Sequence, residues 1–518
     1  MAVLSIFSEV LTRPSGLLWA FAVPGLLYAA VTLIYRLYWH PLSRVPGPMA
    51  ARLSGWYEFY QDLILKGHLP KAVPRLHAQY GPVIRINPNR VHVDDVDFYH
   101  EVYRSNTKYH KDPAVYGNIG GVGRSLATEP DPAIHKMKRS LVRGFFSAQY
   151  ISTMAPLVHK VVRNSLDEAA EYHRNGRPLD LQRMFASISA EVITQVLFGS
   201  SLDRLDRGKG KEVVLDTLDA FSHSFQLPKH FPRLAGLIMG LPASVADFLL
   251  PGYHGFRKQC ESWIEQAQEK QSTGKYSGEH GRLTLFDLLL DPELVKDEEG
   301  HKISLPRPTK RELVDEVLAY YIAGTHSTGV TLSLATFYLL KNPAVVQKLR
   351  DELAALPCNK DNILEYQTLL SAPYLSAVVK EVLRIVTPIP GTLARVVPTG
   401  GVVVHGHYLP AGTSVTVHQR TVHYDSRIFP EPHIFRPERW IGPEASGLDK
   451  HQVAFSKGTR NCVGLNLASL ELMLCLANFF TWFDMTLYKT NESTADWRDN
   501  ALLVTKEPVR VTVDTIRK

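Results

Sequence analysis

The sequence predicts a mainly α-helical protein with a smaller β portion. Helical periodicity dominates from about residue 130 to about residue 385, whereas short alternating runs between about residues 50 and 110 are typical of strands. After about residue 385, prolines and glycines divide the chain into turns and short strands. Because no internal repeat or long low-complexity segment interrupts this order, we expect one compact body.

The individual elements follow from local signals along the chain. Pro82–Asn87 and Arg90–Val93 alternate apolar and polar residues, which predicts the first two strands. Thr309 and Glu312 form a capping box, which predicts the start of a long helix that ends at about Leu340.

The C-terminal third combines one long helix with short strands. Val402–His405 and Ser414–His418 predict strands on either side of the turn at Leu409–Gly412. An apolar helix is expected to follow Cys462 and to end at about residue 480. Leu502–Val513 is predicted to hold a final strand pair.

The composition limits the class of protein. Of 518 residues, 45% are hydrophobic and 21% are charged, which suits a large globular core. The four cysteines are too few and too scattered for a disulfide framework, so they suit a reducing compartment, and no C-x-x-C pair suggests zinc. The net charge of +7 is modest and no basic stretch dominates. We therefore expect an acidic protein partner or an anionic membrane surface, and no nucleic acid.

The N-terminal region contains a candidate membrane segment. Pro14–Tyr35 carries no charged residue and is about long enough to cross a bilayer as a helix. Arg36, Arg44 and Arg52 follow it, and this positive-inside bias predicts that the C-terminal part lies in the cytoplasm. We expect a single-pass transmembrane helix, with a buried globular helix as the alternative.

The most specific motif is the run from Phe455 to Gly464, which contains Cys462 and precedes an apolar helix. A cysteine near a helix start lies close to unpaired N–H groups, which favour the thiolate that binds metals. Gly458 and Gly464 allow the backbone to approach a flat ligand closely. Arg460 is placed to meet an anionic group on that ligand. The alternative is a buried structural cysteine.

The pattern Phe-x-x-Gly-x-Arg-x-Cys-x-Gly resembles the haem-binding loop of the cytochrome P-450 family. The resemblance extends from about residue 40 to the C-terminus, and details around Trp39–Pro48 look like fungal membrane-bound members of secondary metabolism. It implies the cytochrome P-450 fold, haem b (iron protoporphyrin IX) as cofactor, and Cys462 as the axial iron ligand. It also implies a membrane anchor at residues 1–45 and a haem-thiolate monooxygenase domain at residues 46–518.

Glu381-Val-Leu-Arg384 lies about 80 residues before the cysteine loop, and Arg439 falls between them. This order resembles the family's buried network of one glutamate and two arginines, which supports the haem loop. Carried over, Glu381, Arg384 and Arg439 are structural residues. The alternative is an exposed ion pair of little energetic value.

The resemblance also implies a set of residues around the haem carboxylates. His135 and Arg139 resemble the family's Trp-x-x-x-Arg helix, with histidine in place of tryptophan, and Arg395 matches its strand arginine. Together with Arg460, these residues are expected to bind the two haem propionates, because guanidinium groups bind carboxylates in a bidentate manner. Phe455 and Gly464 complete the cofactor loop. The alternative is that they are solvated surface charges.

The long helix carries Ala323-Gly-Thr-His-Ser-Thr, which resembles the family's oxygen-activation motif. Gly324 is expected to make room for oxygen, and Ser327 and Thr328 to supply hydroxyl groups. His326 occupies the position of the family's acid, where an imidazole can relay protons at neutral pH. The alternative is that His326 satisfies the backbone of a kinked helix.

The resemblance implies a monooxygenase that inserts one oxygen atom from O2 into a lipophilic small molecule, for which a terpenoid or polyketide is the hypothesis. Because no Gly-x-Gly-x-x-Gly fingerprint is present, electrons are expected from NADPH–cytochrome P-450 reductase. Its acidic face would meet Lys136, Lys138, Arg143 and Lys457. The endoplasmic reticulum membrane is the expected location.

The apolar segment Phe231–Tyr253 is interpreted as a lid that touches the bilayer, although it suits a core equally well. Two other functions stay open. One is a haem-thiolate enzyme that desaturates, dehydrates or rearranges its substrate at the altered His326-Ser327 site. The other is a haem sensor without catalysis.

Overall fold

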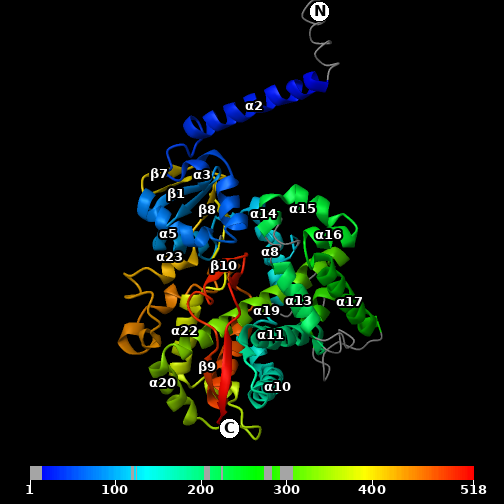
Figure 1. The fold of residues 1–518 in the computed structure, drawn as a ribbon, viewed down its shortest axis with the longest axis vertical. Helices are drawn as coiled ribbons and strands as arrows, with labels where there is room; N and C mark the ends of the chain where they lie inside the picture. The colour runs from blue at the N-terminus through cyan, green and yellow to red at the C-terminus, as the bar shows by residue number, and fades with distance from the viewer. Residues whose placement is uncertain are drawn as a thin grey trace, which may run out of the picture.

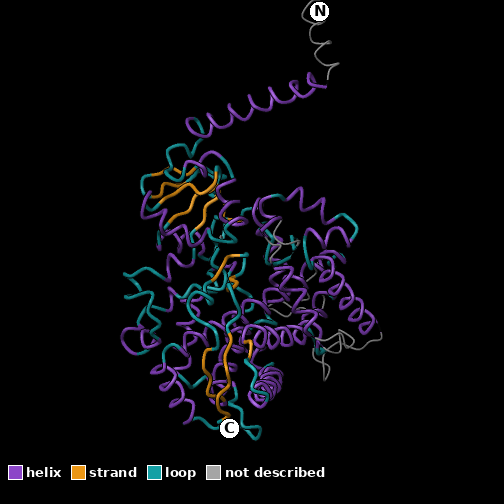
Figure 2. The backbone as a smooth tube through the Cα atoms, viewed as in Figure 1, coloured by secondary structure: helices purple, strands orange, loops and turns teal. Residues whose placement is uncertain are grey.

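The protein is mostly helical, and its strands form a few small sheets, as Figure 2 shows. The prediction of a mainly α fold with a smaller β portion is therefore confirmed. The helix α2 (Pro14–Tyr38) projects from the end of the body that carries the largest sheet (Figure 1). The computed structural model describes residues 14–117, 122–123, 125–202, 211–222, 226–272, 283–291, 294, 307–391 and 393–517.

Helices build most of the body. Within the described residues they are α2, α3 (Met49–Leu53), α4 (Trp56–Phe59), the π-helix η1 (Tyr60–Ile64), α5 (Leu69–Tyr80), α6 (Val96–Tyr103), α7 (Pro113–Tyr116), α8 (Pro132–Arg143), α9 (Ala148–Thr153), α10 (Ala155–Arg174), α11 (Leu181–Phe198), α13 (Lys211–Ser222), α14 (Gln226–His230), α15 (Pro232–Met239), α16 (Ala243–Leu249), α17 (Tyr253–Ser272), α18 (Leu285–Leu290), α19 (Lys310–Leu340), α20 (Pro343–Ala354), α21 (Tyr366–Leu369), α22 (Pro373–Val386), α23 (Gln419–His423), the 3-10 helices η4 (Pro437–Trp440), η5 (Gly442–Ala445), η6 (Asp449–His451) and η7 (Gly458–Arg460), and α24 (Leu465–Trp482).

The largest sheet has the strand order β1-β2-β8-β5-β3, in which β2 and β8 are parallel and the other neighbours antiparallel. A second sheet has the order β4-β12-β9, and β6–β7 and β10–β11 form two hairpins. The strands are β1 (Val83–Asn87), β2 (Arg90–Val93), β3 (His110–Lys111), β4 (Leu179–Asp180), β5 (Arg395–Val396), β6 (Val402–Val404), β7 (His407–Leu409), β8 (Ser414–Thr416), β9 (Phe483–Leu487), β10 (Trp497–Asp499), β11 (Leu503–Thr505) and β12 (Arg510–Ile516).

The first two predicted strands are confirmed as β1 and β2, whereas the pairing predicted near the C-terminus is wrong. β11 pairs with β10, and β12 pairs with β4 and β9, so the two strands within Leu502–Val513 do not pair with each other. β6 and β8 are also separate, because β8 joins the largest sheet. Local alternation predicts a strand but carries no information about its partner.

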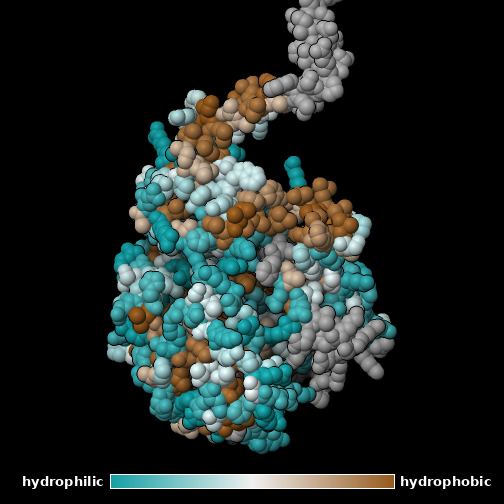
Figure 3. Space-filling view, in the orientation of Figure 1, coloured by the Kyte–Doolittle hydropathy of each residue, from teal (hydrophilic) through white to brown (hydrophobic). Residues whose placement is uncertain are grey.

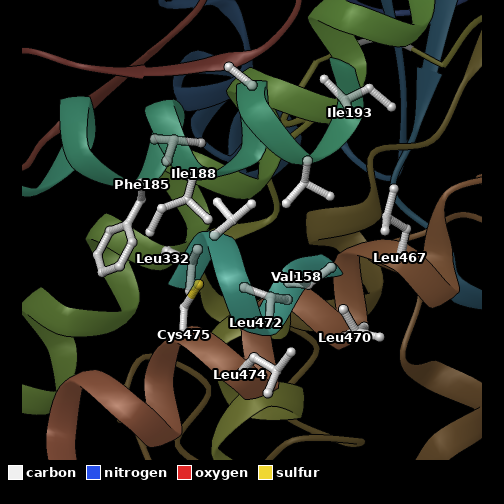
Figure 4. Packing of buried hydrophobic residues seen from close by; sticks show 14 of the residues in the cluster. Val158, Phe185, Ile188, Ile193, Leu332, Leu467, Leu470, Leu472, Leu474 and Cys475 are labelled. Atoms are coloured by element: carbon white, nitrogen blue, oxygen red, sulfur yellow. The ribbon is translucent and has the colours of Figure 1, made fainter. Parts of the chain in front are cut away.

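The long predicted helix is confirmed as α19 and forms the centre of the core. Its capping box is present, since Thr309 Oγ1 accepts from the Glu312 N–H and the Glu312 carboxylate accepts from the Thr309 N–H. The helix is buried on nearly all sides, and α11 packs along it. In Figure 4, Phe185 and Ile188 from α11 lie near Leu332 from α19, with Leu472 and Cys475 from α24 beside them.

The N-terminal helix is apolar and stands apart from the body. Its described side chains begin at Ala22, and Leu26, Leu27 and Val31 among them are exposed. Ala22–Tyr38 is shorter than a full membrane span, whereas α24 is long and apolar enough but is 72% buried and belongs to the core. In Figure 3, apolar residues gather on α2 and over α15 and α16 at the same end of the molecule.

A buried arginine joins α2 to the largest sheet. The guanidinium of Arg85, in β1, donates to the carbonyl oxygens of Arg36 at 3.1 Å, Leu42 at 3.3 Å and Pro88 at 2.8 Å. A guanidinium satisfied by carbonyls in this way holds the end of α2 against the sheet.

α24 carries a buried carboxyl group that the sequence did not single out. Ser189, in α11, donates a hydrogen bond of 2.6 Å to Glu471 in α24. Burial raises the pKa of Glu471 to about 8, and the hydrogen bond from Ser189 only partly opposes that shift. Glu471 is therefore a neutral carboxylic acid at neutral pH.

We predict that Glu471→Gln makes the stability of the protein fall less as the pH rises from about 4.5 to about 8. The folded wild type keeps a proton that the unfolded chain releases above about 4.5, so its stability falls between about pH 4.5 and about pH 8. The slope is about 1.4 kcal/mol per pH unit. Thermal unfolding midpoints measured across this range should fall further for the wild type than for the variant. Equal pH dependence would contradict a buried neutral carboxyl group.

Candidate active site

The cysteine loop closes on itself before α24 begins. The Cys462 N–H donates to the Phe455 carbonyl at 2.8 Å, so the two ends of the motif are in contact. Gly458 has a φ of +68°, and a Cβ there would lie 2.5 Å from the carbonyl oxygens of Tyr103 and Arg104. Only glycine fits this close approach to the end of α6.

Solvent reaches Cys462, but the surrounding protein limits hydration of its sulfur. This burial raises the pKa of the thiol, whereas the Gly464 N–H and the guanidinium of Arg139 act in the opposite direction and are weaker. The N–H at the helix start does favour the thiolate, as expected, but burial outweighs it. A bound metal cation would supply the missing stabilisation of the thiolate.

Four cations from separate elements converge near this loop. Arg139, in α8, donates to the carbonyl oxygen of Asn461 at 2.8 Å. Arg460 donates to the carbonyl oxygens of Glu129 at 2.6 Å and Pro130 at 3.2 Å. These bonds use uncharged oxygens, so they satisfy the N–H groups without neutralising the guanidinium charges.

The other two cations lie side by side in the largest sheet. Lys111 in β3 is the register partner of Arg395 in β5. Arg395 donates to the Ala394 carbonyl at 3.0 Å and lies 4.9 Å from the centre of the Tyr103 ring. Lys111 donates to the Ala127 carbonyl and lies 4.5 Å from the Tyr116 ring centre. Sequence reasoning missed Lys111, because only the pairing of β3 with β5 brings it here.

The mutual repulsion of these cations helps to lower their pKa values. Burial and the neighbouring Arg395 hold the pKa of Lys111 well below its usual range. Burial, followed by Arg395, lowers the pKa of Arg460 to about 10. Burial, followed by Arg460 and Lys111, lowers the pKa of His135 to about 3, so His135 is neutral at physiological pH.

Clustered cations whose charged forms are disfavoured fit an anionic ligand. Two carboxylates beside Lys111, Arg139, Arg395 and Arg460 would offset the repulsion, and such groups are carried by haem as propionates. As a thiolate, Cys462 would be a ligand that haem iron accepts. The residues present therefore fit haem, and the site belongs to the class of haem-thiolate proteins.

The structure brings the glutamate and both arginines of the predicted network together. Arg384 donates to Glu381 at 2.8 and 2.9 Å, and Arg439 donates to it at 3.1 Å. The Trp440 indole N–H and the Arg436 backbone N–H also donate to this carboxylate, each at 2.9 Å. Glu381, Arg384 and Arg439 are almost fully buried. The alternative of an exposed ion pair is wrong.

His423 connects this network to the cysteine loop, a contact that sequence reasoning missed. Its carbonyl accepts from Arg384 at 2.9 Å, and its ring Nε2 accepts from the Val453 N–H at 3.0 Å, two residues before Phe455. Burial, followed by Arg384, lowers the pKa of His423 to about 3, so the ring stays neutral and Nε2 can accept.

Three residues of the α19 motif are at least partly exposed. Ala323 is exposed and Gly324 and Ser327 are partly exposed, whereas nearly all of the surrounding helix is buried. The Ser327 hydroxyl donates to the Ala323 carbonyl at 2.6 Å. A Cβ at Gly324 would lie 2.9 Å from Ile193 Cγ1 in α11. The missing side chain therefore makes room for α11.

His326 is buried, as is Thr328. His326 Nε2 is 3.0 Å from the Leu503 carbonyl, so this nitrogen carries the proton and donates to β11. With Thr325 and Arg183, it also lines a cavity of about 150 Å³ between α11, α13 and α19, and this cavity does not include Cys462. The bond to β11 makes His326 part of the tertiary framework.

Of the basic residues expected to meet a reductase, the structure leaves Lys136 and Arg143 exposed. Lys138 instead pairs with the buried Glu316 at 3.2 Å, and Lys457 donates to the Lys450 carbonyl at 2.9 Å. Lys138 therefore has an internal partner, which corrects the expectation that all four form a free surface.

Comparison with known proteins identifies the family. The model of the family Cytochrome P-450 matches residues 48–513. Cytochrome P-450 monooxygenase BOT1 of Botryotinia fuckeliana is 44% identical over 491 residues, which cover 95% of this chain and 94% of that protein. Cytochrome P-450 monooxygenase aneF of Aspergillus aculeatus is 35% identical over 95% of this chain and 98% of its own. Cytochrome P-450 monooxygenase phqM of Penicillium fellutanum is 35% identical over 91% and 87%.

The chain therefore belongs to the cytochrome P-450 family, whose cofactor is haem b. It is an oxidoreductase of the monooxygenase class, and enzymes of this class need O2 and a redox partner. The resemblance stated from the cysteine loop is confirmed at the level of the family.

We predict that Glu381→Ala abolishes haem incorporation. The substitution leaves the guanidinium groups of Arg384 and Arg439 buried without their counter-charge, which typically costs about 3–5 kcal/mol. The haem content of purified protein and its thermal unfolding midpoint would test this. Glu265→Gln is the matched control, because Glu265 pairs with Lys310 at 3.0 Å where both side chains are mostly exposed. Normal haem content in Glu381→Ala would contradict the prediction.

We predict that Lys111→Met speeds haem loss by about tenfold, equivalent to about 1.4 kcal/mol of lost anion binding. The readout is the rate of haem transfer from the oxidised protein to an excess of a haem-free acceptor globin. Lys108→Met is the control, since Lys108 is an exposed lysine of the same segment. Unchanged or slower haem loss in Lys111→Met would exclude a contribution from Lys111.

Proposed function

We propose that this protein is a membrane-anchored monooxygenase that inserts one oxygen atom from O2 into a lipophilic small molecule of fungal secondary metabolism, in the terpenoid or polyketide class. The observation that carries the proposal is an exposed cysteine beside which four cations converge, of which Arg395 is buried and Lys111, Arg139 and Arg460 are partly exposed. The three fungal relatives, all named as monooxygenases, support the reaction class.

In this proposal Cys462 is the axial iron ligand, and Arg139, Arg395, Arg460 and Lys111 bind the propionates. Haem would supply the activation of O2 and the oxidation of substrate. Phe455 and Gly464 hold the loop, because the Phe455 carbonyl fixes the Cys462 N–H and the Gly464 N–H faces the sulfur.

His135 adds a neutral imidazole beside the proposed propionate cluster. As a neutral ring it can donate one hydrogen bond without adding to the positive charge there. This suits a position that already holds several cations. A protonated histidine would increase the repulsion.

Ser327, Thr328 and His326 are proposed to manage protons on the oxygen side. The Ser327 hydroxyl now bonds to Ala323, so it must turn from that carbonyl to donate elsewhere. His326 would act indirectly, by fixing β11 against α19 through Leu503. Gly324 would let α11 and α19 approach closely enough to hold this arrangement.

Residues 1–45 are proposed as the anchor and residues 46–518 as the catalytic domain. The exposed apolar side chains of α2 support a single membrane crossing, and Arg36 and Arg44 support a cytoplasmic catalytic domain. The exposed apolar residues of α15 and α16 would touch the same bilayer, which suits a lipophilic substrate. The endoplasmic reticulum is the proposed membrane.

NADPH–cytochrome P-450 reductase is the proposed electron donor. Lys136 and Arg143 lie on α8, which also supplies Arg139 to the cation cluster. Exposed basic residues on this helix would meet an acidic protein surface near the proposed haem.

A second candidate function is desaturation, dehydration or rearrangement by the same haem site. The two residues that depart from the family's motif favour it, because both already form hydrogen bonds. Ser327 bonds within its own helix and His326 bonds to β11. An enzyme of this kind that needs no external protons would tolerate both contacts. Dehydrated or rearranged product that forms without NADPH or O2, or desaturated product that forms with both and carries no added oxygen atom, would identify it.

We predict that the reduced wild type binds carbon monoxide with the shifted Soret band characteristic of thiolate-ligated haem, and that Cys462→Ser loses it. Precursor that accumulates after gene deletion would then be tested with reductase, NADPH and O2. The expected product is the precursor with one added oxygen atom, detected by mass spectrometry. Cys475→Ser is the control, because Cys475 is buried in the core. Absence of the band from the wild type would refute the proposal.

A further inference from the structure

A buried cluster of charges joins α14, at the start of the apolar segment 226–249, to the N-terminal part of the chain. Lys229 Nζ lies 2.7 Å from Asp62 Oδ2 and 2.9 Å from Glu58 Oε1. His230 Nε2 lies 2.9 Å from the same oxygen of Asp62. Glu58 and Asp62 are almost fully buried. Two successive residues of α14 are therefore held by α4 and η1.

The cluster is electrically balanced only when α14 is in place. Arg90, in β2, also pairs with Glu58, so two carboxylates face the two permanent cations Arg90 and Lys229. Removing Lys229 would leave one buried carboxylate without a cation. The nearby carboxylates raise the pKa of Lys229 despite its burial, and Arg90 and Lys229 hold the pKa of Glu58 below its usual range despite its burial.

Local backbone geometry places Asp62 for this contact. Residues Tyr60–Ile64 form a π-helix, and the Leu65 N–H donates to the Tyr60 carbonyl five residues earlier. Such turns insert one residue into a helix and are frequent at functional sites. Beside the charges, the Phe231 ring packs against Phe59, with ring centres 5.5 Å apart.

α14 is also attached to the elements around the proposed active site. Gln226 donates to the Asp499 carbonyl in β10 at 2.6 Å. The partner strand β11 accepts from His326 of α19 through Leu503, and the Leu503 N–H donates to Pro388. A chain of contacts therefore leads from Lys229 through the β10–β11 hairpin to the oxygen-side helix.

Past α14 the segment presents exposed apolar side chains. Its exposed residues are Leu234, Leu237, Leu241, Val245, Phe248 and Leu249. We propose that the cluster of Glu58, Asp62, Lys229 and His230 is a latch that sets how fast the segment 226–249 opens to admit and release bulky lipophilic ligands. This inference rests on the proposed haem site, because the segment controls access only if the substrate binds there.

The test uses full-length haem-loaded protein in phospholipid vesicles and the variant Asp62→Asn/Lys229→Met. This pair of substitutions removes the latch but keeps Arg90 paired with Glu58, so no charge is left alone. The probe is a bulky triaryl-substituted imidazole, whose nitrogen ligates haem iron and shifts the Soret band in a stopped-flow experiment. Carbon monoxide is the small probe that needs no opening.

Both association and dissociation of the bulky imidazole should be about tenfold faster in the double variant, while carbon monoxide rebinding stays the same. Lys229→Arg, which keeps the charge, should retain wild-type rates. Lys310→Met is the control for loss of an exposed ion pair. Bulky-ligand rates within about twofold of the wild type would overturn the latch. If the bulky-ligand rates are unchanged but the carbon monoxide band is normal, the latch is wrong and the proposed function still holds.

Hydrogen exchange of the wild type gives a second test that does not depend on the variant folding. Backbone amides of residues 226–231 should exchange more slowly than those of residues 232–249, because the latch contacts α14 directly and the rest of the segment only through α14. Equal exchange rates in the two parts would also overturn the proposal.

Discussion

Positive charge that converges beside Cys462 is the constraint on which the rest of this molecule depends. Lys111, Arg139, Arg395 and Arg460 come from four separate parts of the chain, and their hydrogen bonds go to uncharged oxygens. Their charges repel one another, and this cost is repaid only by an anionic ligand. The four cations thus form an unfavourable arrangement by themselves, and this arrangement suits the binding of an anion.

The network around Glu381 also brings cations together, but these cations have a carboxylate partner within the protein. There one carboxylate accepts from Arg384, Arg439, Trp440 and the Arg436 backbone, so both buried guanidinium groups have a counter-charge inside the protein. This part of the structure is self-sufficient and can hold the cysteine loop in place through His423. One charge cluster has its counter-charge within the fold, whereas the other would gain it from an anionic ligand.

Much of the fold and of the cofactor loop could be predicted from local signals. The capping box at Thr309 marked the start of α19, and the alternation in β1 and β2 marked the first strands. Strand partners could not be predicted, because β11 and β12 each pair with a strand elsewhere. Lys111 could not be predicted as a site residue for the same reason. Its neighbour Arg395 is 284 positions away and lies beside it only because β3 pairs with β5.

The sequence by itself determined the family, because the spacing of Phe455, Gly458, Arg460 and Cys462 is a local property of ten consecutive residues. Tertiary structure alone decided the burial, the neighbours and the hydrogen-bond partners of the side chains. It set the protonation preference of Cys462, directed the Gly324 face toward α11 and tied His326 to β11. The physical reason is that burial, close packing and charge repulsion depend on neighbours that are distant in the chain.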